Sequence, residues 1–126
     1  MHIYWFAHYN LNCPSTRYRG KYPLDYLHSE YGIKSNFVYP ERSFKGIYRF
    51  LCVFLKARCS RKPNSIIVIQ KVCSNGFYAN ALKLLIWLKP QKSLYDLDDA
   101  EYLRKGTKSL HFFLKHCRKI TVGSKA

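Results

Sequence analysis

Two kinds of hydrophobic pattern alternate along the chain: short uninterrupted apolar runs, and longer segments in which apolar residues recur every three or four positions. Uninterrupted runs are typical of strands buried on both faces, as in a parallel sheet. They predict strands at residues 3–7, 65–69, 93–95 and 120–122. A weaker strand is predicted over residues 34–39, ended by Pro40.

The periodic segments predict four helices, over residues 22–31, 43–58, 75–88 and 109–117. Gly32 is suited to cap the first of these helices, and Pro90 stops the third. Each of the last three helices carries an apolar stripe that we expect to face the core. The stripes comprise Phe44, Ile47, Tyr48, Leu51 and Leu55 in the second helix, Phe77, Ala81, Leu84, Leu85 and Leu88 in the third, and Leu110, Phe113, Leu114 and Cys117 in the fourth.

The alternation of strands and helices predicts an α/β fold, a Rossmann-like doubly wound parallel sheet of about five strands with helices on both faces. Parallel strands need long crossovers, which the helices supply. Right-handed crossovers and the usual doubly wound arrangement predict the strand order 3-2-1-4-5. A chain of 126 residues is long enough for one domain and too short for two, so we expect residues 1–126 to form a single domain.

Composition narrows the class of protein. Apolar residues make up 48% of the chain, which excludes a disordered tail. Lys and Arg outnumber Asp and Glu by 22 to 7, and the resulting charge of +15 attracts polyanions such as nucleic acid, anionic lipid or phosphorylated small molecules. Five cysteines without a CxxC pair predict reduced, mostly buried thiols in a cytoplasmic protein. No signal peptide is visible, and the longest apolar run, Phe50–Leu55, is too short to span a membrane.

Candidate binding residues follow the predicted strands, because ligands of an open parallel sheet bind at the carboxyl ends of its strands. A long loop over residues 9–20 follows the first strand, and its Arg17 and Arg19 offer planar donor forks for phosphate or carboxylate. A solvated surface loop is the alternative. Gln70 and Lys71 follow the third strand at the same edge.

Four of the seven acidic residues follow the fourth predicted strand: Asp96, Asp98, Asp99 and Glu101. They could bind a metal ion, accept hydrogen bonds from sugar hydroxyls, or form salt bridges with the loop that carries Arg17 and Arg19. Capping of the next helix is the structural alternative. We favour the arginine–aspartate network, and we expect no metal because no further ligand set is visible.

Other positions provide weaker signals. Ser74 or Asn75 could cap the helix after the third strand, and Gly123 with Ser124 resembles an anion cradle at the start of a further helix. The five histidines show no metal spacing and no triad partner, and the chain has no P-loop, GxGxxG or GxSxG motif. We therefore expect no catalytic residues and no self-contained enzyme.

The second predicted helix carries cations opposite its apolar stripe. They are Arg42, Lys45, Arg49 and Lys56. A basic amphipathic helix can lie on anionic lipid. A solvated outer face of a doubly wound domain is the alternative.

Four segments, in order, resemble a known family: Ser15–Gly20, Ile67–Lys71, Leu94–Asp99 and Ile120–Ser124. They are similar to the N-terminal, acceptor-side domain of glycosyltransferases with the GT-B fold, family 4 type. One branch of that family carries an S-x-R-Y-R loop, a strand ending in Gln-Arg, and a Y-D-[LI]-D-D strand. Lys71 stands where the arginine is usual, which weakens a bidentate role there. The resemblance spans the whole chain.

The resemblance implies an enzyme that transfers a sugar from a nucleotide-sugar donor to a glycan or lipid-linked acceptor, usually with retention. It implies that a C-terminal domain beyond the truncated chain holds the donor, so that residues 1–126 are inactive alone and hold no cofactor. The residues then expected to line the acceptor side are Arg17, Arg19, Gln70, Lys71, Asp98, Asp99 and Ser124.

The charge supports a second hypothesis, a basic module that binds anionic membrane or, less favoured, nucleic acid. In either case we expect a cytoplasmic protein that is soluble or lies on the inner face of the membrane without crossing it. A phosphoacceptor receiver domain is excluded. Such a domain needs acidic residues after its first and third strands, and this chain has Tyr9 and Asn10 after the first and Gln70 and Lys71 after the third.

Overall fold

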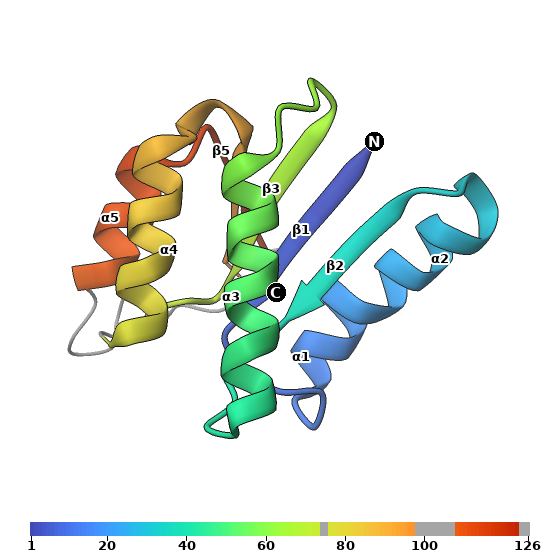
Figure 1. Cartoon of the computed structure of the whole chain (residues 1–126), viewed down its shortest axis with the longest axis horizontal. Coiled ribbons are helices and arrows are strands. Elements are labelled where there is room, and N and C mark those ends of the chain that lie inside the picture. The colour runs from blue at the N-terminus through green and yellow to red at the C-terminus, as the bar shows by residue number, and fades with distance from the viewer. Residues whose placement is uncertain (74–75, 98–107, 124–126) are drawn as a thin grey trace.

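The computed structural model describes residues 1–73, 76–97 and 108–123. Strands and helices alternate along it (Figure 1). The strands are β1 (His2–Ala7), β2 (Lys34–Val38), β3 (Ser65–Gln70), β4 (Ser93–Leu97) and β5 (Lys119–Val122). The helical segments are α1 (Pro14–Thr16), the π-helical η1 (Arg17–Lys21), α2 (Tyr22–Tyr31), α3 (Phe44–Cys59), α4 (Phe77–Leu88), the 3-10 helix η2 (Pro90–Lys92) and α5 (Lys108–His116).

The five strands form one parallel sheet, which confirms the predicted α/β class. Their order is β2-β1-β3-β4-β5, so the predicted order 3-2-1-4-5 is wrong. β3 buries five of its six residues, whereas β2 buries Val38 alone. A central strand is covered on both faces and both edges, so the continuous apolar strand lies in the middle and the more polar one at the edge.

Helices cover both faces of the sheet, as predicted. α2 packs on one face, where Leu24 meets Ile3 and Val68. α3, α4 and α5 pack on the other face over the main core, and Figure 1 shows α3 and α4 side by side there. Phe50 of α3 links these two helices, with ring centroids 4.9 Å from Tyr78 and 6.4 Å from Phe77.

α3 turns a different face to the core from the one predicted. Its buried residues are Gly46, Phe50, Val53 and Ala57. The predicted inward stripe is exposed: Phe44, Ile47, Tyr48, Leu51 and Leu55. Both rows are apolar, so periodicity alone does not select between them, and the row with the smaller residues fits closer to the sheet.

α4 repeats this correction in part. Leu85 is buried as predicted, but its buried companions are Ala79, Leu82 and Ile86, and the expected core residues Phe77, Leu84 and Leu88 are exposed. In α5 the prediction is confirmed for Leu110 and Phe113, which are buried. Leu114 and Cys117 are partly buried and pack against the same core.

The segment after β1 is helical, although a loop was expected. α1 and η1 run directly into α2, so Arg17 and Arg19 lie on a π-helical turn. α2 ends as predicted at Gly32, whose φ of 62° is left-handed and whose N–H donates to the His28 carbonyl at 3.0 Å.

The five cysteines are free thiols, as expected. The expectation that most are buried is wrong, because Cys59 is exposed and the other four are half-buried. Among the described helices, none has both the length and the apolar character needed to cross a membrane.

Candidate functional site

A polar network lies at the carboxyl edge of the sheet, around Asp96 at the end of β4. The Arg19 guanidinium donates to both carboxylate oxygens of Asp96, with Nη2–Oδ1 at 2.5 Å and Nε–Oδ2 at 3.2 Å. The Thr121 hydroxyl on β5 donates to Asp96 Oδ1 at 2.7 Å. The ion pair confirms the expected arginine–aspartate network for these two residues.

Burial strengthens this ion pair. The Asp96 side chain is 7% exposed and that of Arg19 is 29% exposed. A two-pronged arginine–carboxylate pair fixes the orientation of both groups, and its charges are poorly screened where water is excluded. The network thus presents a fixed guanidinium at the rim and a nearly dry carboxylate beneath it.

Gly20 allows η1 to lie close enough for Arg19 to reach Asp96. A Cβ at this position would lie 3.0 Å from the Trp5 Nε1 atom and 3.1 Å from the Gln70 Oε1 atom. Real Cβ atoms rarely approach so closely, and these neighbours are fixed by a mutual hydrogen bond. A larger residue at this position would therefore have to displace the Trp5 and Gln70 side chains, and glycine lets η1 pack closely against them.

Gln70 supports this turn from below. Its side chain is buried; Oε1 accepts a hydrogen bond from Trp5 Nε1 at 3.0 Å, and Nε2 donates to the Ser15 carbonyl at 3.1 Å. The amide therefore ties β1, β3 and α1 together. Its role in the structure is to position the segment that carries Arg19.

Lys71 follows directly and is buried. Its backbone φ of 56° is left-handed, and its N–H donates to the Asp96 carbonyl at 2.9 Å. Such backbone strain in a residue with a side chain persists only where the surroundings enforce it, and it is found often at functional sites. Gln70, Lys71 and Asp96 thus form one connected corner of the sheet.

Arg17 lies apart from this network. Its Nη1 donates to the carbonyls of Leu11 at 2.6 Å and Asn12 at 3.1 Å. It therefore shapes the turn after β1. That turn and residues 39–43 line a hollow of about 430 Å³ at the carboxyl ends of β1 and β2.

Tyr78 at the start of α4 reaches the same edge. Its hydroxyl donates to the Ala7 carbonyl at 2.8 Å, and burial raises the pKa of the phenol well above its ordinary value. Burial likewise raises the pKa of the Cys117 thiol to about 11, an effect partly opposed by a hydrogen bond with Ser93. Both groups therefore stay neutral at physiological pH.

Several predicted site residues lie outside the described ranges: Asp98, Asp99 and Ser124, together with the candidate caps Ser74 and Asn75. Gly123, just before Ser124, donates from its N–H to the Leu97 carbonyl at 2.9 Å and so stays on the sheet edge. Among the residues that the structure describes, no three His, Cys, Asp or Glu side chains are grouped as a metal site requires.

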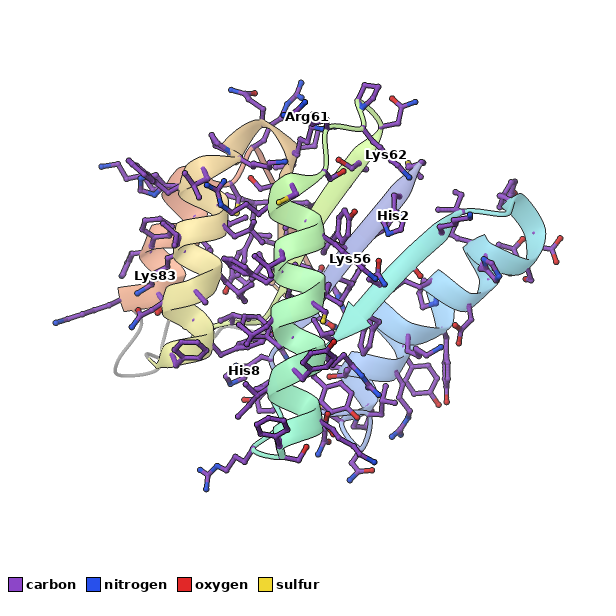
Figure 2. The ribbon with its side chains drawn as sticks, in the orientation of Figure 1. His2, His8, Lys56, Arg61, Lys62 and Lys83 are labelled. Carbon is purple, nitrogen blue, oxygen red and sulfur yellow. The ribbon has the colours of Figure 1, made fainter. Side chains whose placement is uncertain are left out.

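The predicted membrane-facing cations lie on a separate part of the molecule. Arg42, Lys45, Arg49 and Lys56 are all exposed, before or along α3. Figure 2 shows Lys56 projecting from the side of α3 nearer β2, and His8 near the carboxyl end of β1. The two groups of candidates therefore belong to two distinct surfaces.

Three partners in the network were not predicted: Thr121, Trp5 and Ser15. Thr121 lies opposite Asp96 in the parallel register of β4 and β5, which only the structure shows. From the sequence alone Trp5 is indistinguishable from an ordinary core residue, although the ring N–H of a buried tryptophan usually needs a hydrogen-bond acceptor.

A hollow lies at the opposite, amino edge of the sheet. It measures about 620 Å³ and is lined at the starts of β3, β4 and β5 by Ser65, Ser93 and Lys119. None of the predicted site residues lines it. Comparison of the chain with models of known protein families, with curated proteins and with solved structures gives no match.

Proposed function

We propose that this chain is the acceptor-side domain of a GT-B-type glycosyltransferase, with a further domain supplying the nucleotide-sugar donor. The observation that carries the proposal is the Arg19–Asp96–Thr121 network at the carboxyl edge of a parallel sheet. Ligands of such sheets bind at this edge. Arg19 is common to the network and to the residues that the resemblance implies, and Asp96 and Thr121 lie within two of the segments that carry the resemblance.

The chemistry of the network suits a hydroxyl-rich or anionic acceptor. Arginine forks bind phosphate or carboxylate, and fixed carboxylates accept hydrogen bonds from hydroxyl groups. Gln70 and Lys71 hold the corner in place, so the polar groups are oriented before a ligand arrives. Preorganisation of this kind lowers the entropic cost of binding.

Binding to the isolated chain is the first test. Isotope-labelled residues 1–126 would be titrated with a lipid-linked or soluble acceptor glycan and, separately, with nucleotide sugars. We expect amide shifts in Arg19, Asp96 and Thr121 with the glycan only. Arg19→Lys should weaken glycan binding by about tenfold, because one prong of a two-pronged contact is lost; Arg49→Lys on α3 is the matched control.

Transfer by a two-domain protein is the second test. Asp96→Asn, which keeps shape and removes charge, should lower kcat/KM for the acceptor by roughly tenfold to a hundredfold with the KM for the donor unchanged. Thermal unfolding of each variant separates loss of fold from loss of function. Full activity of a folded Asp96→Asn protein, or glycan-induced shifts confined to the amino edge, would refute the site.

A further inference from the structure

Exposed apolar side chains gather on the outer surface of the α3–α4 layer. Phe44 is 88% exposed, Phe77 is 71% exposed and Trp87 is 65% exposed. We call the whole set the apolar ridge. It comprises Phe44, Ile47, Tyr48, Leu51 and Leu55 of α3 and Phe77, Leu84, Trp87 and Leu88 of α4.

The ridge is continuous because of helix geometry. In α3 its members are spaced mainly by three or four residues, and in α4 Leu84 follows Phe77 by two turns and Leu88 follows Leu84 by one turn, so each set lies along one side of its helix. Both stripes face away from the row that packs on the sheet. α3 and α4 lie side by side (Figure 1), and the rings of Phe50 and Phe77 are in contact between them. Exposed apolar patches of this extent mark interaction surfaces.

Cations flank the ridge on both sides. Lys45, Arg49 and Lys56 lie along α3, and Lys83 lies on α4. Figure 2 shows Lys56 and Lys83 projecting to opposite sides of the helix pair. Neither helix contains an aspartate or a glutamate. A partner that matches this surface therefore offers an apolar region to the ridge and negative charges to the cations on either side of the ridge.

We propose that the apolar ridge docks on the surface of an anionic lipid bilayer. Interfacial helices place aromatic and aliphatic side chains roughly 5–10 Å into the boundary between headgroups and acyl chains, while Lys and Arg pair with anionic headgroups. α3 has 16 residues and so offers a stripe about 24 Å long. The aromatic rings of Phe44, Tyr48 and Trp87 suit the headgroup level.

Two other occupants fit less well. A second copy of the chain also carries +15, so apposed ridges would bring like charges together. Nucleic acid would be bound through phosphate contacts and base stacking, which the ridge's aliphatic Ile47, Leu51 and Leu55 do not provide. The proposal rests on exposed surface and charge, and it holds whether or not the chain serves a glycosyltransferase.

Trp87 provides a direct test. The chain has two tryptophans, and the other, Trp5, is hydrogen-bonded to Gln70 on the opposite face of the sheet. The full chain would be mixed with vesicles of phosphatidylcholine alone and of phosphatidylcholine with phosphatidylglycerol. We expect a blue shift of tryptophan emission and quenching by brominated acyl chains with the anionic vesicles only. Trp87→Phe should abolish both signals, and Trp5→Phe should leave them.

Matched substitutions separate the ridge from general charge. Tyr48 and Tyr31 are equally exposed, on α3 and α2 respectively. Combining Tyr48→Ser with Leu51→Ser should lower vesicle binding by about tenfold or more, whereas Tyr31→Ser should not change it. Lys45→Gln with Arg49→Gln should weaken binding more than Lys34→Gln with Lys115→Gln, although each pair removes the same charge.

Vesicle binding by the ridge and control variants decides whether the ridge docks on lipid. Salt-dependent binding to anionic vesicles that is lost in the ridge variants supports the proposal. Circular dichroism verifies that each variant is folded. Absence of vesicle binding by the folded chain overturns the proposal, as does equal binding by ridge and control variants. A dimer in sedimentation velocity that the ridge substitutions dissociate would assign the surface to a second copy instead.

Discussion

Lys71 adopts a strained backbone conformation at the carboxyl edge of the sheet. Its left-handed backbone lets the chain leave β3 while its N–H still donates to the Asp96 carbonyl. A side chain in this conformation costs about 1 kcal/mol or more, because Cβ crowds the following carbonyl. The geometry of the corner, and with it the placement of Asp96 beneath Arg19, is therefore maintained against a local preference.

Substitution at Lys71 measures that strain. Lys71→Gly and Lys71→Ala both remove the side chain, but only glycine is free of the left-handed penalty. We expect Lys71→Gly to be more stable than Lys71→Ala by about 1 kcal/mol in urea unfolding. Gly32→Ala is a useful reference, because its φ of 62° is similar and nothing lies within 4 Å of the added Cβ. Equal stability of the two Lys71 variants would contradict a strained corner.

At the scale of elements, α3 has two apolar rows and only one of them packs on the sheet. The buried row is Gly46, Phe50, Val53 and Ala57, and Ser43 caps the helix by accepting the Gly46 N–H at 3.1 Å. Small residues at both ends of this row let the helix axis approach the strands. The larger apolar residues of the other row are left at the surface, where they become available to a partner.

Two phenylalanines of α3 test this orientation. Phe50→Ala should destabilise the protein by about 3–5 kcal/mol, because a buried ring leaves a cavity. Phe44→Ala should change the free energy of unfolding by less than about 0.5 kcal/mol, since the ring is exposed. Chemical denaturation of both variants is the measurement. A larger loss from Phe44→Ala than from Phe50→Ala would contradict this orientation and favour the inward stripe predicted from the sequence.

At the scale of the whole molecule, the charge of +15 opposes compaction. Few carboxylates are available to neutralise it, and the ion pairs found among the described residues are Arg19 with Asp96 and Lys21 with Asp25. With 22 Lys and Arg against 7 Asp and Glu, the carboxylates of the chain are too few to neutralise most of the positive charge. An anionic partner would relieve this repulsion, which is consistent with the proposed lipid surface.

Salt should consequently stabilise the chain. Raising NaCl from about 0.02 M to about 0.3 M shortens the screening length severalfold, so repulsion between surface cations weakens. We expect the urea midpoint to increase over this range. Repeating the titration with Lys45→Gln and Arg49→Gln combined should show a smaller increase. A midpoint that fell with salt would show instead that favourable ion pairs dominate the electrostatics.

The pattern of apolar residues determined the five strands, the four longer helices, their order along the chain and the α/β class, because local periodicity and capping decide where these elements begin and end. It also placed Arg19 and Asp96 at one edge, since parallel strands share their carboxyl ends. Strand order, the buried row of α3 and the Gln70–Trp5 contact were decided only in the tertiary structure. Each depends on contacts between segments that are distant in sequence. Strand order depends on which strand is covered well enough to occupy the centre of the sheet, and here β3 does so while β2 lies at the edge. The buried row of α3 depends on which of its two apolar rows packs against the core.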